Sequence, residues 1–224
     1  MAKKQEIKDP LNMDEAISAS EAFFLKNKNI ILGVIGGIIL LILAVMGYKH
    51  FISEPRELHA NEAIFKAEEL FRAENFEQAL NGDSLGTKGF LYVAKEYSNT
   101  KAGKLANAYA GICLAQTGKY EEALKYLDKF NAKDLLVAPA LMATMGNCYA
   151  QSGKLDKAAD MLYKAATNAD SQALSPIYLI QAGELYEKLG KNSEALKVYQ
   201  LIKDKYSNSY QAMEIDKYIE RASK

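Results

Sequence analysis

The fold is decided by the stretch Gly146-Asn-Cys-Tyr-Ala-Gln-Ser-Gly153-Lys-Leu-Asp-Lys-Ala158, because its pattern recurs on both sides of it. The pattern is Gly, six residues, Gly, four residues, Ala. Its members are Gly111, Gly118 and Ala123, then Gly146, Gly153 and Ala158, then Gly183, Gly190 and Ala195. The three units start 35 and then 37 residues apart, so the spacing inside each unit is constant while the connection varies. This periodicity predicts a solenoid of helical hairpins.

Each member of the pattern has a predicted structural role. Met142, Gly146 and Tyr149 have helical spacing on one face. The second Gly is expected to end that helix, because Gly reaches the left-handed conformation at low cost. Gly146 and Ala158 are then small residues on facing helices, where two backbones approach within ~8 to 10 Å. A large side chain at either position should push the hairpin apart.

At these residues the chain resembles the tetratricopeptide repeat. The family's aromatic and large apolar signature positions hold Tyr149, Tyr186, Met142 and Leu179. The first unit departs from the family, with Leu114 and Asn107 at those positions. The resemblance covers about 104–209. It implies a protein-binding scaffold and does not imply a reaction.

Composition limits the possible functions. The chain has 224 residues, of which 49% are hydrophobic and 25% charged, enough for one ordinary domain plus extra segments. Its 28 basic residues are balanced by 28 acidic ones, so it lacks the basic surface of a nucleic-acid binder. Four prolines, no tryptophan and regular apolar periodicity favour an all-α chain.

A charge-free run of nineteen residues, Ile30 to Tyr48, predicts a transmembrane helix. At ~1.5 Å per residue it spans roughly the ~30 Å hydrocarbon core. The alternative is a cleaved signal peptide, whose apolar region would be ~7 to 15 residues long and followed by a small-x-small site. Here Lys49, His50 and Phe51 follow instead, so we expect the segment to stay as an anchor. Within it, Gly33 and Gly37 are a weak signal for pairing with another membrane helix.

The orientation of this helix is set by a narrow difference in charge. Close to the membrane, Lys26 and Lys28 precede the helix, and Lys49, Arg56 and Lys66 follow it, which is nearly a tie. The remaining lysines of the tail, Lys3, Lys4 and Lys8, favour a cytoplasmic N-terminus. The tail itself is expected to be solvated and partly helical from Asn12; lying on the membrane surface is the alternative.

The arrangement of segments resembles a narrower family. A charged tail ending in Glu21-Ala-Phe-Phe-Leu-Lys-Asn27, one membrane helix and a repeat domain of this length is similar to the bacterial inner-membrane ancillary Sec translocon subunits (YfgM-like). The resemblance implies a repeat domain in the periplasm. It also implies protein partners: translocon subunits, periplasmic chaperones or secreted clients.

The expected domain organisation places Pro55 between the anchor and the soluble part, because proline breaks a helix that arrives from the membrane. The expected segments are a cytoplasmic tail 1–29, a transmembrane helix 30–48, a linker 49–55, an imperfect first repeat 56–103 with a loop insertion 81–89, repeats 104–138, 139–175 and 176–208, and a capping helix 209–224.

Residues for chemistry are scarce. Cys113 and Cys148 occupy equivalent places in successive repeats, where helices lie ~8 to 10 Å apart. A disulfide requires ~4.4 to 6.8 Å between Cα atoms, so both cysteines are interpreted as packing residues. The only histidines, His50 and His59, have no partners for catalysis or metal binding. We therefore expect no catalytic, metal or cofactor site.

By the same resemblance to tetratricopeptide repeats, the first helix of each repeat lines a concave groove. The groove positions are Ala108, Tyr109, Ile112, Gln116, Ala143, Thr144, Asn147, Gln151, Ile180, Gln181, Glu184 and Lys188. Some family members clamp a C-terminal carboxylate there with several Lys and Asn side chains, whereas this set has one Lys beside one Glu. We therefore expect a neutral, partly apolar groove for a peptide segment or an amphipathic helix.

Three functional hypotheses follow. The first is an ancillary or chaperone-like adaptor of the Sec translocon on the periplasmic side of the inner membrane. The second is a structural scaffold that organises a multiprotein complex of the cell envelope. The third is a repeat receptor that faces the cytoplasm. An enzyme is the least favoured class.

Overall fold

The computed structural model describes residues 13–130 and 137–224, with side chains from Ala22 onward. In these residues the chain is helix and loop, apart from one isolated bridge between Gly82 and Lys88. The predicted all-α fold is confirmed. The chain divides into two compact units, Met1–Pro55 and Arg56–Lys224, which are described separately below.

The first unit is dominated by the helix α1 (Met13–Tyr48), which carries the charge-free run. Large apolar side chains along this run are exposed, among them Ile30, Leu40 and Met46 with exposed fractions of 67%, 68% and 61%. The helix belongs to a continuous helical stretch, Ala22–Arg72, that is long and apolar enough to cross a membrane by length and composition. A helix that is apolar on all sides requires an apolar environment, and the described residues of this chain do not supply one.

The structure differs from the predicted linker 49–55, because the chain stays helical there. A π-helix, η1 (Lys49–Ser53), follows α1, and α2 (Glu54–Arg72) begins directly after it. The Glu54 N–H donates to the carbonyl of Lys49, the wider spacing of a π turn. Pro55 is the second residue of α2 and, having no N–H, donates no hydrogen bond to the preceding turn. The π turn also relieves the clash of a proline ring with the carbonyl four residues before it, which is how the chain passes Pro55 without a break.

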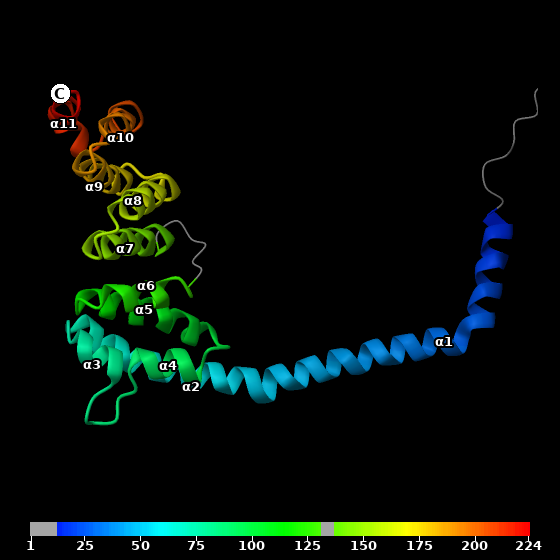
Figure 1. Ribbon diagram of the computed structural model, residues 1–224. Coiled ribbons are helices and arrows are strands. Elements are labelled where there is room, and N and C mark those ends of the chain that lie inside the picture. Colours follow the sequence, from blue (N-terminus) through cyan, green and yellow to red (C-terminus); the bar gives the residue numbers. More distant parts are fainter. Residues whose placement is uncertain (1–12, 131–136) are drawn as a thin grey trace, which may run out of the picture. The chain divides into compact units, whose positions relative to one another are not determined.

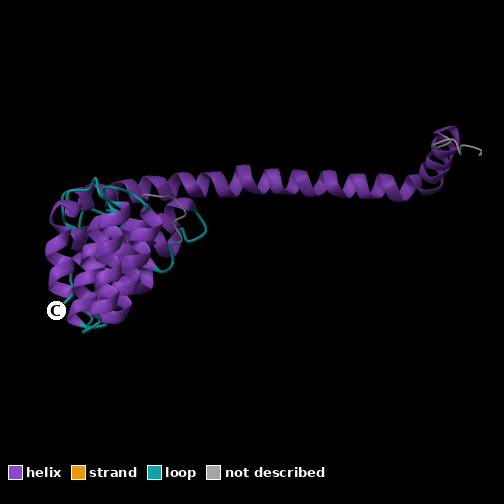
Figure 2. Cartoon of the chain, turned by 90° about the horizontal axis from the view of Figure 1, so that it is seen from above, coloured by secondary structure: helices purple, strands orange, loops and turns teal. Residues whose placement is uncertain are grey.

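The second unit is a solenoid of antiparallel helix pairs, as Figure 1 and Figure 2 show for the helices from α3 to α11. After α2 the helices are α3 (Phe76–Asn81), α4 (Phe90–Glu96), α5 (Lys101–Gln116), α6 (Tyr120–Leu127), α7 (Val137–Gln151), α8 (Leu155–Ala169), α9 (Ser175–Lys188), α10 (Asn192–Lys205), η2 (Gln211–Glu214) and α11 (Ile215–Ala222). The pairs α5–α6, α7–α8 and α9–α10 carry the three copies of the Gly, Gly, Ala pattern.

The turn inside each hairpin has the same geometry. Gly118, Gly153 and Gly190 have φ values of +78°, +74° and +72°, in the left-handed region where glycine is favoured. The N–H of the following lysine donates to the carbonyl five residues earlier, for example from Lys154 to Tyr149 at 2.9 Å. This is the Schellman pattern, which satisfies carbonyls at the end of the first helix.

The two helices of each hairpin approach closely at the first Gly of the pattern. A Cβ added at Gly111, Gly146 or Gly183 would come within 2.6, 2.8 or 2.3 Å of a side-chain atom of Leu127, Leu162 or Tyr199, respectively. The alanines of the pattern are fully buried on the second helices. The pattern thus marks the tight part of each hairpin, and a side chain at the glycine would collide with the facing helix.

Asn107, the departure from the family pattern, is accommodated within its own helix. Its side chain is buried and donates to the carbonyl of Gly103 at 3.0 Å. Gly103 in turn allows α5 to approach the end of α4, because a Cβ there would lie 1.8 Å from the carbonyl oxygen of Tyr97. An amide replaces the expected apolar residue here because the helix backbone itself satisfies it.

The first hairpin of this unit is interrupted between α3 and α4. The intervening loop is closed by Asp83, whose carboxylate accepts from the N–H groups of Leu85 and Thr87 at 2.9 Å each. These hydrogen bonds hold the pKa of Asp83 below its usual value. The loop therefore has a defined structure and presents Leu85 to solvent with 91% of its surface exposed.

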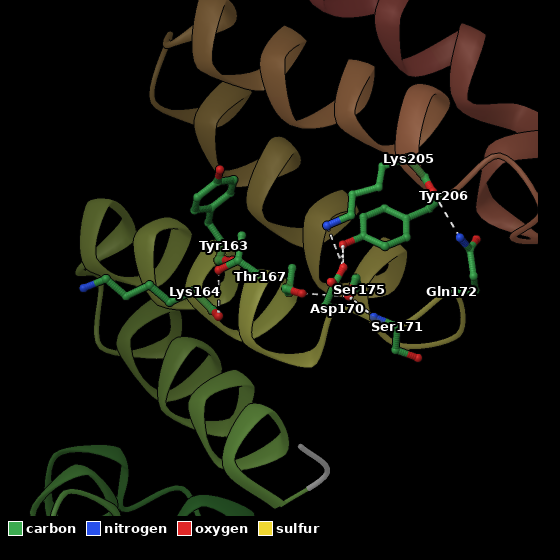
Figure 3. A network of polar contacts seen from close by, with 10 residues as sticks. Tyr163, Lys164, Thr167, Asp170, Ser171, Gln172, Ser175, Lys205 and Tyr206 are labelled. Carbon is green, nitrogen blue, oxygen red and sulfur yellow. Dashed lines mark hydrogen bonds and ion pairs between the residues drawn. The ribbon is translucent and has the colours of Figure 1, made fainter. Parts of the chain in front are cut away.

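A polar network fixes the connection between α8 and α9 to the end of α10. Figure 3 shows Lys205 and Tyr206 reaching toward Asp170, with distances of 2.7 Å from the ammonium and 3.0 Å from the hydroxyl. Asp170 has φ +39° at the end of α8. On the same connection, the buried hydroxyl of Ser175 donates to the carbonyl of Ala166 at 2.7 Å. The hairpins α7–α8 and α9–α10 are therefore joined by polar bonds at their connection as well as by apolar packing.

The last helix closes the solenoid. Ile215 and Ala222 of α11 are buried against α10, and Arg221 makes two bonds of 2.7 Å to the Glu187 carboxylate on α9. Glu187 also accepts from the fully buried Tyr199 at 2.5 Å. Helix α11 thus covers the apolar face that the last hairpin would otherwise expose.

Candidate peptide-binding groove

The sequence-predicted groove residues lie on α5, α7 and α9 and fall into three classes by exposure. Ala108 and Ala143 are buried, with 3% and 6% of their surfaces exposed. The half-buried members are Tyr109, Ile112, Thr144, Ile180 and Gln181. The exposed members are Gln116, Asn147, Gln151, Glu184 and Lys188. A partner molecule would meet the last two classes first.

Three of these residues line an apolar pocket between α5 and α7, here called the α5–α7 pocket. Its volume is about 340 Å³. The described residues that line it are Leu105, Ala108, Tyr109, Ile112, Val137, Ala140 and Leu141. This lining is apolar except for the hydroxyl of Tyr109. The volume falls at the small end of ligand pockets, ~300 to 1,000 Å³, which suits one or two side chains of a partner.

The ring of Tyr109 is held in place by aromatic neighbours. It stacks on Phe90 with 4.8 Å between ring centroids and meets the edge of Phe71 at 5.2 Å. Burial, and then the nearby carboxylate of Glu68, raises the pKa of the Tyr109 hydroxyl, so the phenol stays neutral. The wall that Tyr109 gives to the pocket is therefore rigid and uncharged.

The α7 wall of the pocket was missed by the sequence prediction. Val137, Ala140 and Leu141 lie in the first two turns of α7, whereas the predicted groove positions on this helix began at Ala143. Their spacing leads to Thr144 at i, i+3, i+4 and i+7, the pattern of one helix face. Extending that pattern backward from Thr144 would have found them.

The polar members of the groove have few bonds inside the chain. Thr144 donates to the carbonyl of Ala140 at 2.9 Å. Among the described residues, the side chains of Gln116, Asn147 and Gln151 have no hydrogen-bond partner. The buried carboxamide oxygen of Gln181 also lacks one within the same residues. Leaving a buried acceptor unpaired costs free energy.

A second cavity lies on the other side of Leu141. Its volume is about 380 Å³, and its described lining includes Met142, Met145 and Met161 together with Phe130 and Leu127. Methionine side chains are unbranched and adapt to irregular shapes. Helix α7 is thus flanked by two cavities along its first half.

The residues considered for chemistry do not form a reactive site in the part of the chain that the structure describes. Cys113 and Cys148 are free and buried, and burial raises the pKa of Cys113 to about 12 and that of Cys148 in the same direction. His50 and His59 are exposed beside Glu54 and Glu62 on their own helical segments. No group of three metal-ligating side chains occurs among the described residues.

Comparison with known proteins identifies the repeats. A tetratricopeptide repeat model matches residues 178–209, which cover most of α9 and α10. A PPR repeat model matches residues 143–165, on α7 and α8. The search of curated proteins finds no match. The chain therefore carries helical repeats of the tetratricopeptide and PPR type after a long apolar N-terminal helix. This architecture is typical of protein-binding scaffolds.

Proposed function

We propose that this protein is a membrane-anchored scaffold that binds protein partners through the groove formed by α5, α7 and α9. The observation that carries the proposal is the α5–α7 pocket, an open apolar site beside side-chain carboxamides that have no hydrogen-bond partner among the described residues. Such a combination suits a peptide segment, whose side chains fill apolar pockets and whose backbone bonds to amides.

The membrane anchor is supported by the exposure and continuity of the first helix. Its large apolar side chains are uncovered, and aromatic residues stand near both ends of the charge-free run, Phe23 and Phe24 at one end and Tyr48 at the other. Aromatic residues are enriched at the two membrane interfaces. The helix continues to Arg72, and α2 contributes Ala60, Ile64 and Ala67 to the core of the repeat unit. Because the apolar helix continues into a helix that packs in the repeat unit, a membrane anchor is favoured over a cleaved signal sequence.

The finer proposal is an ancillary or chaperone-like subunit of the Sec translocon, with the N-terminus in the cytoplasm and the repeats in the periplasm. It rests on the resemblance in segment order to the YfgM-like family. A phosphatase active only outside the cytoplasm, fused after Lys224, tests the topology. Activity supports the periplasmic location, and inactivity with a stable fusion favours the cytoplasm-facing receptor.

The partner class is tested by crosslinking in intact cells, followed by purification of the full chain in mild detergent. Recovery of translocon subunits together with secreted clients supports the adaptor. A constant set of envelope proteins without clients favours the structural scaffold instead. RNA in the purified complex would contradict both; we do not expect it, because the predicted groove positions hold one lysine beside one glutamate.

A further inference from the structure

We infer that the α5–α7 pocket anchors one large apolar side chain of a partner peptide that carries acidic residues next to that anchor. This inference rests on the proposed function and specifies the chemistry of its ligand. Two observations carry it: the apolar lining of the pocket, and two lysines at one end of it that form no ion pair with another described residue.

The pocket accepts an apolar group and rejects a charge. None of its described lining residues is charged, and burying a charge there without a partner would be costly. The wall built from Tyr109 is fixed by Phe71 and Phe90, so little order has to be gained when a side chain enters. A preformed pocket of this kind suits the buried central anchor of an interface.

The charge at the end of the pocket is positive. Lys101 lies one helical turn before Leu105 on the same face of α5, and Lys104 lies one turn before Ala108. Both lysines are exposed, and neither ammonium group forms an ion pair with another described residue. Exposed lysines beside an apolar site favour a ligand with carboxylates at that end.

An acidic side chain that contacts the start of α5 is already hydrogen-bonded. The carboxylate of Glu57, on α2, accepts from the backbone N–H groups of Lys101 and Ala102 at 2.9 and 3.0 Å. Glu57 therefore caps the start of α5 and leaves the lysine ammonium groups to solvent. The positive charge is available to a ligand.

Beyond the opposite end of the pocket, α5 and α7 present uncharged polar side chains. Asn147 and Gln151 continue the face of α7 beyond Thr144, and Gln116 continues that of α5. Carboxamides bond to peptide N–H and carbonyl groups in any sequence. The expected ligand therefore places its acidic residues near Lys101 and its apolar anchor in the pocket. Its backbone lies along the side-chain carboxamides of Gln116, Asn147 and Gln151.

The test uses the full chain in detergent and three labelled twelve-residue peptides in a Gly/Ser background. The first contains Leu next to Asp-Asp, the second Leu next to Lys-Lys, and the third Ala next to Asp-Asp. Fluorescence anisotropy measures their affinities. We expect the first peptide to bind about tenfold more tightly than either of the others, since each exposed charge contact contributes little alone. Equal binding of the first two would overturn the acidic specificity, and equal binding of the first and third would overturn the anchor.

Protein variants assign the binding to this site. The charge reversal K101E/K104E should invert the preference between the first two peptides, and Lys164→Glu, on the exposed face of α8, is the matched control that should leave it unchanged. Ala140→Phe should fill the pocket and weaken the first peptide about tenfold. The charge reversal is at exposed positions and does not depend on whether the filled variant folds. Binding of the first peptide that survives both variants would exclude this pocket.

The same variants separate this inference from the proposed function. If the unmodified chain, K101E/K104E and Ala140→Phe all recover protein partners from cells while none of the three peptides binds the unmodified chain, the scaffold proposal stands and the pocket inference fails. If no protein partner is recovered with the unmodified chain, the scaffold proposal itself fails.

Discussion

The hairpins α5–α6 and α7–α8 share the same glycine and alanine pattern and differ in the length of their second helices. Helix α6 has 8 residues and α8 has 15. In both hairpins the first Gly contacts a buried leucine of the second helix, Leu127 in one and Leu162 in the other. Leu127 is the last residue of α6 and borders the methionine-lined cavity, whereas Leu162 is followed by two more turns of α8.

The difference shows that two properties of a repeat are set separately. The small-residue pattern fixes how closely the two helices of a hairpin approach. The length of the second helix determines how much of the next repeat it covers. Where α6 stops early, the first half of α7 borders two cavities; the pattern alone would not indicate a site at this junction.

The largest expected effect on stability is at the close contact between Gly146 and the second helix of the hairpin α7–α8. Gly146→Leu should lower the free energy of unfolding by about 3 kcal/mol, because the new side chain must displace Leu162 and widen the hairpin. Asn147→Ala, at the exposed neighbouring position, should change it by less than about 0.5 kcal/mol. Urea unfolding of the two variants measures the difference. The reverse order would mean that the helix faces are assigned wrongly.

A smaller effect on stability is expected when the first Gly of each hairpin is replaced by Ala, and this pair of variants compares the two hairpins directly. Gly111→Ala should cost about 2 kcal/mol and Gly146→Ala about 1 kcal/mol, because the added Cβ at Gly111 would lie 3.1 Å from the backbone nitrogen of Leu127, whereas at Gly146 the nearest backbone atom, the carbonyl oxygen of Ala158, lies at 3.4 Å. Thermal and urea unfolding of the two single variants provide the comparison. Equal costs would show that the closer backbone of α6 does not add to the strain at Gly111.

The next prediction concerns the last hairpin, α9–α10, whose apolar face is covered by α11. Arg221→Ala should lower stability by about 1 kcal/mol, since it leaves the Glu187 carboxylate without its charged donor. Lys217→Ala on the exposed face of α11 is the control, because its ion pair with Glu214 is fully at the surface. Similar losses in the two variants would contradict a specific role for Arg221.

The same pair predicts a pH dependence. Arg221 holds the pKa of Glu187 below its ordinary value of 4.5, so the carboxylate has a lower pKa in the folded state than in the unfolded state. Its contribution to stability is therefore fully present above that value and is lost as the pH falls through the folded pKa. Unfolding curves between pH 7 and pH 3 should lose less stability for Glu187→Gln than for the unmodified chain. Parallel curves of stability against pH would rule out the Glu187 carboxylate as a source of the pH dependence.

The smallest effect on stability is expected at an ion pair that occurs both between α5–α6 and α7–α8 and between α7–α8 and α9–α10. Lys154 pairs with Glu121 at 2.7 Å, and Lys191 pairs with Asp156 at 2.6 Å. Both pairs are at the surface, so Lys154→Ala and Lys191→Ala should each cost less than about 0.5 kcal/mol, and less in high salt. A loss above 1 kcal/mol at only one of them would show that the two junctions are held together differently.

The sequence predicted what depends on local chemistry. The solenoid, the turns at Gly118, Gly153 and Gly190, and the helix after the last repeat all follow from spacings of a few residues. Glycine at a turn and small residues at a crossing have the same meaning wherever they occur, so the repeat could be inferred from one chain.

What could not be predicted depends on contacts between distant residues or on a choice between two local solutions. The cap that Glu57 provides to α5 joins residues 44 positions apart, and no local pattern announces it. At Pro55 the prediction chose a break, and the π turn instead absorbs the proline within the helix. The α7 wall of the pocket was missed because the predicted groove began at Ala143, one turn after the pocket residues of α7.

The two buried cysteines have a practical consequence. Burial raises the pKa of the Cys113 thiol to about 12, so the thiol stays protonated at pH 7, and its side chain has no exposed surface. Cys148 is buried in the equivalent place of the next repeat. Thiol reagents should therefore ignore the folded chain and label it only as it opens, so the native cysteines report unfolding without any mutation. A cysteine introduced at Gln151 could then carry a probe for the groove, because the two native cysteines would stay unlabelled in the folded chain.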